Sequence, residues 1–172
     1  ADGADIAARD QEGKTALHRA AERGHGDIAG FLLARGADAS AAAADGATPL
    51  MEAAAGGHAG ITSLLVQRGA RTGGRGRNGQ TALSLAVAAG HETVVGILVD
   101  AGAPVDEAGP GGVTPLISAA GLGSIAIVRT LLDSQRVRMI KGTARLADEH
   151  TVEVETIDAA IPAPAPGGSH HR

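Results

Sequence analysis

Residues 13–36, GKTALHRAAERGHGDIAGFLLARG, decide the fold of this chain because their pattern returns at a fixed interval. The first glycine is followed two places on by a threonine, and this pair recurs every 33 residues. A second glycine keeps the same step. A period of 33 residues indicates a repeat protein in which each unit packs only against its neighbours. The recurring positions are Gly13, Gly46, Gly79 and Gly112, then Thr15, Thr48, Thr81 and Thr114, and then Gly24, Gly57, Gly90 and Gly123.

The sequence of one repeat predicts two short helices joined by a turn. Thr15 can cap the first helix, since its hydroxyl can accept a hydrogen bond from a free backbone N–H. Leu17 and Ala20 lie three residues apart and therefore share one face of that helix. Gly24 ends the first helix, as glycine does at the position after a helix C-terminus. The second helix carries a wider apolar stripe and closes at Gly36.

The composition supports the repeat over a compact globule. Of the 172 residues, 44% are hydrophobic, yet Phe31 is the single aromatic residue. Aromatic side chains bury more area than any others and usually dominate a globular core. A core of Ala, Leu, Ile and Val, with Leu50 among its members, suits short helices stacked on their neighbours.

The pattern D-x-x-G-x-T-[AP]-L-H-x-A-A-x-x-G-H, followed by I, LL and GAD, resembles the ankyrin repeat over about residues 3–133. The resemblance implies an all-α solenoid of helix–turn–helix units. It divides the chain into the end of an upstream repeat, three full repeats and an incomplete one. From residues 1–9 we infer that the chain is a fragment of a longer protein. The boundaries are 1–9, 10–42, 43–75, 76–108 and 109–136.

Two departures from the family pattern carry structural expectations. Asp10 and His18 are kept in the first repeat alone. In this family the histidine and threonine belong to a hydrogen-bond network between loop and helix, so we expect weaker ties in repeats two to four. Gln135 and Arg136 occupy the places of Gly102 and Ala103, and the solenoid is expected to stop there.

Residues 137–157 change to an alternating pattern, in which Val152 and Val154 are interleaved with acidic residues. This pattern predicts a short β-hairpin. The Pro/Gly-rich residues 158–172 predict a disordered tail. Residues 137–157 also resemble a segment of the FAD-dependent pyridine-nucleotide disulfide reductases, although that family's dinucleotide fingerprint and redox cysteine pair are missing. The alternative hypothesis is that the chain is an accessory segment of a larger enzyme, such as a fusion with a flavoprotein disulfide reductase.

Residues 74–79, GRGRNG, fit the G-x-G-x-x-G pattern of a phosphate-binding turn. Such a turn needs a preceding strand and a helix directly after it, whereas this stretch falls between two repeats. Its basic residues leave two interpretations open. One is contact with an acidic partner or nucleic acid, and the other is a solvated, flexible loop. The basic residues are Arg71, Arg75 and Arg77.

Three histidines, His25, His58 and His91, also recur every 33 residues. Stacked helices lie about 10 Å apart whereas zinc ligands lie about 2 Å from the ion, so one ion cannot join two repeats. We expect these histidines to cap the second helix of each repeat instead. His170 and His171 form at most an adventitious metal site. The carboxylates are scattered, and we predict no catalytic residue, no cofactor and no metal.

The chain has no cysteine, which leaves its redox compartment open. No apolar run approaches the roughly 20 residues of a membrane span, and residues 1–10 are unlike a signal peptide. The formal net charge of −4 argues against general nucleic-acid binding. We expect a cytoplasmic protein with no membrane and no small-molecule substrate as partner.

The ankyrin resemblance implies that another protein binds to the concave face and the loop tips. The contact positions flank the turn glycine and end the first helix of each repeat. These positions hold charged residues in the first repeat and mostly small residues in repeats two to four. Either the affinity for a partner is therefore modest, or repeats upstream of this segment carry the binding. A scaffold role stays open beside this one. The predicted partner-binding residues are Gln11, Glu12, Lys14, Glu22, Arg23, Asp45, Arg77, Asn78 and Gln80.

Overall fold

A computed structural model describes residues 3–141, 144–148 and 151–154, and the chain divides into two compact units, Ala1–Gln135 and Arg136–Arg172. The predicted tail 158–172 lies outside the described residues. The elements are α1 (Ala16–Glu22), α2 (Gly26–Ala34), α3 (Pro49–Ala55), α4 (Ala59–Gln67), α5 (Ala82–Ala88), α6 (Glu92–Asp100), the 3-10 turn η1 (Pro110–Gly112), α7 (Pro115–Leu122), α8 (Ile125–Lys141), β1 (Ala144–Asp148) and β2 (Thr151–Val154).

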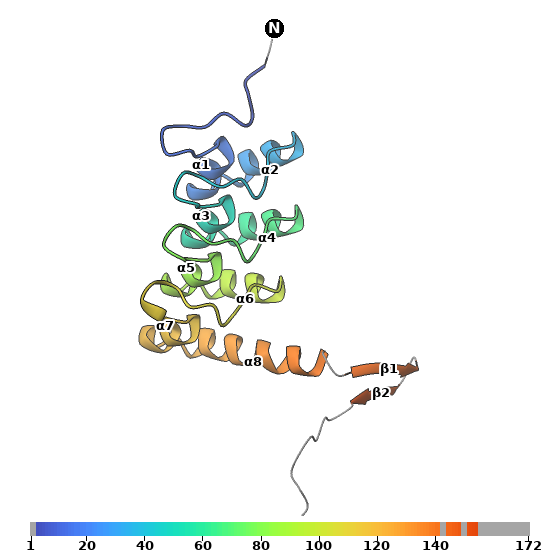
Figure 1. Ribbon diagram of the computed structural model, residues 1–172. Helices are drawn as coiled ribbons and strands as arrows, with labels where there is room; N and C mark the ends of the chain where they lie inside the picture. The colour runs from blue at the N-terminus through green and yellow to red at the C-terminus, as the bar shows by residue number, and fades with distance from the viewer. Residues whose placement is uncertain (1–2, 142–143, 149–150, 155–172) are drawn as a thin grey trace, which may run out of the picture. The chain divides into compact units, whose positions relative to one another are not determined.

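The helices of the first unit stand in two rows, as Figure 1 shows. Helices α1, α3, α5 and α7 contact one another in sequence along one row, and α2, α4 and α6 do so along the other. Within the first three repeats, α1 packs against α2, α3 against α4 and α5 against α6. This arrangement confirms the predicted all-α solenoid of helix–turn–helix repeats.

The core runs through both rows and is made of small and branched aliphatic residues. Leu17, Leu50, Leu65, Leu83 and Leu98 are all almost fully buried. Leu50 therefore lies in the core, as its place in the repeat predicted. Within the described residues, no helix is long and apolar enough to cross a membrane.

The turn before each first helix is closed by a backbone hydrogen bond that recurs in all four repeats. Asp10 N donates to Lys14 O at 3.0 Å, and the same bond recurs 33, 66 and 99 residues on, from Ala43, Gly76 and Gly109. The turn glycines, Gly13 and its equivalents, all have φ between 74° and 81°. Other residues resist that left-handed conformation, so the glycine is required. This closing bond needs no side chain, and in the first repeat Asp10 Oδ1 adds two hydrogen bonds, from Glu12 N and Lys14 N.

A second backbone bond joins the turn of one repeat to that of the next. Ala44 N donates to Glu12 O at 3.0 Å, and Arg77 N donates to Asp45 O at 2.7 Å. The equivalent donor in repeat four would be Pro110, which has no N–H. This turn-to-turn bond is separate from the His–Thr network and is shared by the first three repeats. The break falls at Pro110, between repeats three and four.

Threonine hydroxyls cap three of the four first helices, whereas Thr15, for which the cap was predicted, makes no side-chain cap bond to a helix N–H. The hydroxyls of Thr48, Thr81 and Thr114 each accept a hydrogen bond from the backbone N–H three residues on, at 3.1–3.3 Å. In the first repeat, Thr15 instead pairs with the buried ring of His18. Each cap satisfies a helix N–H that has no partner within the helix.

His25, His58 and His91 occupy the N-cap positions of α2, α4 and α6, as expected, but their side chains make no cap bond; the rings of His58 and His91 instead join neighbouring repeats. His58 and His91 precede α4 and α6, but their rings make no bond to those helix ends. The His58 ring lies 3.2 Å from Glu22 O, and the His91 ring lies 3.0 Å from Ala55 O. These acceptors are the last residues of α1 and α3. Each ring thus reaches the C-terminal end of the first helix in the preceding repeat.

The fourth repeat ends differently because it lacks a stop signal. In the earlier repeats Gly36, Gly69 and Gly102 follow the second helix with φ of 78–90°. Gln135 stands in that place, and α8 continues to Lys141. The helix thus includes the first residues of the stretch 137–157, in which we had expected β-structure.

The second unit contains the predicted hairpin further along the chain. Strands β1 and β2 pair antiparallel, with Ala144 opposite Val154, and the register shifts between Leu146 and Asp148. Val152 and Val154, whose alternation with acidic residues predicted the hairpin, both lie in β2.

Gly57 and Gly123 occupy the same place in two repeats and allow a matched test of the histidine contact. Both have positive φ, but a Cβ at Gly57 would lie 2.7 Å from His91 Cε1, whereas one at Gly123 would meet no atom within 4 Å. We expect Gly123→Ala to lower the free energy of unfolding by about 1–2 kcal/mol through backbone strain. Gly57→Ala should cost roughly 1–3 kcal/mol more through overpacking. Urea denaturation of both variants measures the difference, and equal losses would contradict the role of the ring.

Candidate functional site

A groove of about 290 Å³ runs beside the turns of the first three repeats. The turns provide one side of the groove, and α3 and α5 provide the other. Five of the nine predicted partner-binding residues line it. They are Lys14, Asp45, Arg77, Asn78 and Gln80, and they lie beside Ala47, Met51, Glu52, Ala55, Gly76 and Leu85.

Lys14 is held among carboxylates at one end of this groove. Its ammonium lies 2.9 Å from Glu52, 3.6 Å from Glu12 and 3.7 Å from Glu22, and its side chain is 12% exposed. Burial alone would lower the pKa of Lys14. The hydrogen bond to Glu52 and the charges of Glu52 and Glu22 outweigh burial and raise that pKa. Lys14 is therefore a fixed positive charge that joins the first two repeats.

Arg19 pairs with Asp10 and shares Glu12 and Glu22 with Lys14. Its guanidinium lies 2.6 Å from Asp10 and 3.1 Å from both Glu12 and Glu22. The hydrogen bonds from Arg19 are the largest influence on Asp10 and Glu22, and they hold the pKa of each carboxyl below its usual range. Both carboxylates thus stay ionised at neutral pH.

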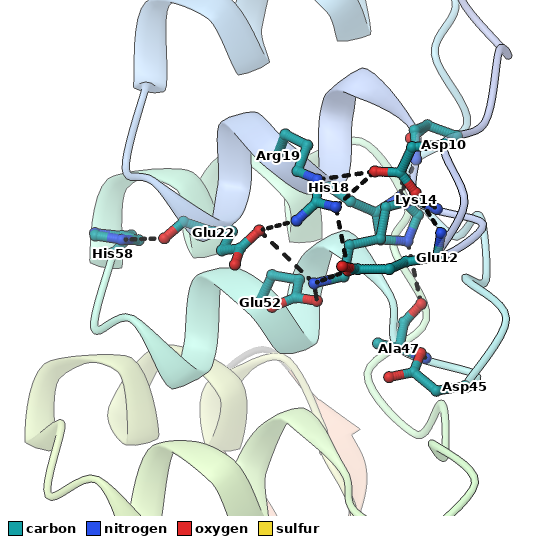
Figure 2. Close-up of polar contacts among 11 residues, drawn as sticks. Asp10, Glu12, Lys14, His18, Arg19, Glu22, Asp45, Ala47, Glu52 and His58 are labelled. Carbon is teal, nitrogen blue, oxygen red and sulfur yellow. Dashed lines mark hydrogen bonds and ion pairs between the residues drawn. The ribbon is translucent and has the colours of Figure 1, made fainter.

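These side chains form one connected network, which we call the acidic cluster: Asp10, Glu12, Lys14, Arg19, Glu22 and Glu52. Figure 2 shows that α1, α3 and the first turn all contribute to it. Four carboxylates and two cations give a net charge of −2 (2 − 4). The acidic cluster is therefore positioned by its own ion pairs and keeps an excess of negative charge.

His18 lies beneath the acidic cluster and supports the second turn. Its side chain is fully buried, with Nε2 3.1 Å from Ala47 O and Nδ1 within hydrogen-bond distance of Thr15 N and Oγ1. A neutral ring that carries its proton on Nε2 satisfies all of these contacts. Burial is the main reason that the pKa of His18 lies below its ordinary value.

The arginines of residues 71–77 are not all free for a partner. Arg77 Nη2 donates to Ala44 O at 3.0 Å, and Arg75 Nη2 donates to Ala108 O at 2.7 Å. Each therefore bonds to the loop of a neighbouring repeat, which argues against a loose basic loop. Residues 74–79, which fit the glycine fingerprint, lie in the loop between α4 and α5, where Gly76 and Gly79 form the repeat's own turn.

The other predicted residues lie around the groove. Glu12 and Glu22 adjoin it through Lys14, whereas Gln11 and Arg23 are exposed beyond its lining. Sequence reasoning missed Glu52, which occupies the same place in repeat two as Arg19 in repeat one. The signal available in the sequence was that this repeat position holds Arg19 in one repeat and Glu52 in the next. Stacking places equivalent positions of neighbouring repeats side by side, so the two opposite charges were expected to lie close together.

Comparison with known families identifies the repeat. A family model described as "Ankyrin repeats (3 copies)" matches residues 2–75 and 72–141, and the chain therefore belongs to the ankyrin repeat family. None of the curated proteins compared with the chain matches it. Repeats of this family generally bind other proteins and are typically non-catalytic. The second match reaches residue 141, and the resemblance of 137–157 to flavoprotein disulfide reductases finds no support.

Metal-binding chemistry is not indicated in the part of the chain that the structure describes. No group of three or more His, Asp or Glu side chains there is arranged to hold an ion. His170 and His171 lie outside the described residues.

Removal of the Lys14 charge should destabilise the first two repeats. Lys14→Met leaves Glu12, Glu22 and Glu52 facing one another without the central cation. We expect a loss of about 1–3 kcal/mol in the free energy of unfolding, because the pair with Glu52 is largely buried. The double variant K14M/E52Q removes one of the repelling charges and should recover part of the loss. Urea denaturation of K14M and of K14M/E52Q measures the free energy of unfolding of each variant. An unchanged free energy of unfolding in K14M would contradict the role of Lys14.

The buried His18 predicts a dependence of stability on pH. The unfolded chain takes up a proton at His18 near pH 6.5, while the folded chain resists it because the pKa is lowered. Stability should therefore fall as the pH drops from 7.5 to 5.5. The contributions of Asp10 and Glu22 are lost only below about pH 4. His18→Gln should flatten the profile between pH 7.5 and 5.5, and an unchanged slope in that variant would contradict the prediction.

Proposed function

We propose that this chain binds another protein through the groove, and that the bound segment carries Lys or Arg beside the acidic cluster. The observation that supports this most directly is the convergence of the turns of three consecutive repeats on one groove with fixed charges. Fixed charges favour binding because little conformational entropy is lost when a partner docks. The general role of the family in binding proteins supports the same proposal.

The lining of the groove suits a peptide segment better than a small molecule. Sites for small molecules are usually enclosed by apolar and aromatic side chains and hold about 300–1,000 Å³. This groove has about 290 Å³, and its lining includes Lys14, Asp45, Glu52 and Arg77. Asn78 and Gln80 add amide groups that can bond to an extended backbone.

Because the acidic cluster has an excess of negative charge, we expect the bound segment of the partner to be positively charged. Lys14 and Arg19 are already occupied by the carboxylates of the acidic cluster. A basic side chain from a partner adds attraction, whereas an acidic one meets a net charge of −2. Such charge complementarity acts mostly on the association rate and on specificity, and salt weakens it.

A photo-crosslinking amino acid placed at Asn78 tests the proposal. Asn78 is exposed and lines the groove, and Gln67 at the end of α4 is an exposed control away from it. We expect proteins in an extract of the source cells to crosslink to position 78 and not to position 67. The crosslinked peptides should contain Lys or Arg. Equal crosslinking at the two positions would contradict the proposal.

The binding of a captured partner should then depend on the groove itself. Ala55 lines the groove and is exposed. Ala55→Arg places bulk and positive charge there, and we expect the dissociation constant to rise at least about tenfold. Gln67→Arg is the matched control and should bind normally. An equal affinity of both variants would remove the groove as the binding site.

A further inference from the structure

The charge of the groove changes sign between its first turn and its third. At the turn position that holds Glu12 in repeat one and Asp45 in repeat two, repeat three has the neutral Asn78. At the position before it, repeats one and two have uncharged residues, whereas repeat three has Arg77. The groove therefore loses an acidic side chain and gains a basic one at the same turn.

Arg77 is held in place, but its charge is not compensated. Its backbone N donates to Asp45 O at 2.7 Å, and its Nη2 donates to Ala44 O at 3.0 Å. Among the described residues, Arg77 takes part in none of the ion pairs, whereas Lys14 pairs with three carboxylates. A guanidinium has five N–H donors, so most of those of Arg77 are left to bind a partner.

The neighbouring Arg75 does not offer the same site. Its Nε lies 3.6 Å from Glu107 Oε2, and its Nη2 donates to Ala108 O at 2.7 Å. It also lies outside the lining of the groove, whereas Arg77 belongs to it. An anionic group in the groove would therefore pair with Arg77.

The two charged regions of the groove lie about one repeat apart. The acidic cluster joins repeats one and two, where Lys14 lies 2.9 Å from Glu52, and Arg77 belongs to the turn of repeat three. Packed helices, and hence neighbouring repeats, are about 10 Å apart. An extended segment advances about 3.3 Å per residue. Two side chains that reach both regions would therefore be separated by roughly two to four residues.

From this arrangement we infer that the bound segment carries both kinds of charge. A Lys or Arg side chain lies at the acidic cluster, and an Asp or Glu side chain roughly two to four residues away pairs with Arg77. This inference rests on the proposed function, because it describes the segment bound in the same groove. A carboxylate suits Arg77, since a guanidinium can donate two parallel N–H bonds to its two oxygens.

The separation of the charges also gives the segment a direction. A segment bound in reverse would place its acidic side chain at the acidic cluster and its basic side chain at Arg77, and like charges disfavour that orientation. The acidic cluster, Asp45 and Arg77 together have a net charge of −2 (−2 − 1 + 1). The segment as a whole is therefore still expected to be positively charged.

Selection of peptides from a random-sequence library displayed on phage, with the 172-residue chain immobilised, tests the inference. We expect the enriched peptides to be positively charged and to carry Lys or Arg together with one Asp or Glu, always on the same side and at a constant spacing. A preference for a basic residue with none for an acidic one would overturn this inference and leave the proposed function intact. Enrichment of no sequence would overturn both.

Variants of Arg77 assign the acidic preference to its guanidinium. Arg77→Gln keeps a donor for Ala44 O without the charge, so the preference for Asp or Glu should disappear while that for Lys or Arg stays. Arg77→Glu should replace it with a second basic preference. Both variants keep the backbone bond to Asp45 O, so the turn is retained. An acidic preference that survives in Arg77→Glu would overturn the inference.

Arg68→Glu is the matched control, because Arg68 is an exposed arginine at the end of α4, outside the lining of the groove. It should select the same peptides as the unchanged chain, and loss of the acidic preference there would contradict the role of Arg77. The affinity of one enriched peptide, measured by fluorescence anisotropy, completes the test. Replacement of its Asp or Glu by Ala should weaken binding to the unchanged chain about two- to fivefold and leave binding to Arg77→Gln unaltered. An equal loss with both chains would overturn the pairing.

Discussion

The structure depends on the burial of each repeat's apolar face by the next repeat. A pair of helices with seven and nine residues is too short to be stable alone. Leu17, Leu50 and Leu83 become buried because a following repeat lies over them, and Leu116 stays exposed without one. Burial of apolar surface is the main favourable contribution to folding, so stability comes from the contacts between repeats more than from any single repeat.

Glycines allow these contacts to repeat. A left-handed residue after the first helix turns the chain sharply, and the missing Cβ leaves room for the ring of the following repeat's histidine. The fourth repeat shows what happens when the pattern changes. Ser124 takes the histidine's place and bonds to Glu92, and Leu122 lies against Gly90 where a ring would otherwise lie. Pro110 removes the backbone bond between turns. Repeats three and four are thus joined mainly by apolar packing.

The polar residues are concentrated at the other end of the stack. The first two repeats share the acidic cluster and the buried His18, and neither has an equivalent further along. Met51 fills the place of His18 in repeat two and lies against the glycines of the next loop. An apolar side chain there leaves no polar group to satisfy in repeat two, whereas Ser84 at the same place in repeat three hydrogen-bonds to Thr81. In the proposed function, the charges near the first turns determine the sign of the partner's charge.

The sequence by itself determined the class of fold, the place of the turns and of helices α1 to α7, and the hairpin, but not the end of α8 at Lys141. These features follow from local rules: threonine caps, left-handed glycines and apolar spacing act within a few residues. The tertiary structure alone decided how the histidine rings join neighbouring repeats, and that Lys14 and Glu52 meet across two of them. It also decided which of the predicted residues share the groove, with Gln11 and Arg23 outside it. The physical reason is that these contacts form between residues about 33 positions apart, so they depend on the exact stacking of one repeat on the next, which local patterns do not specify.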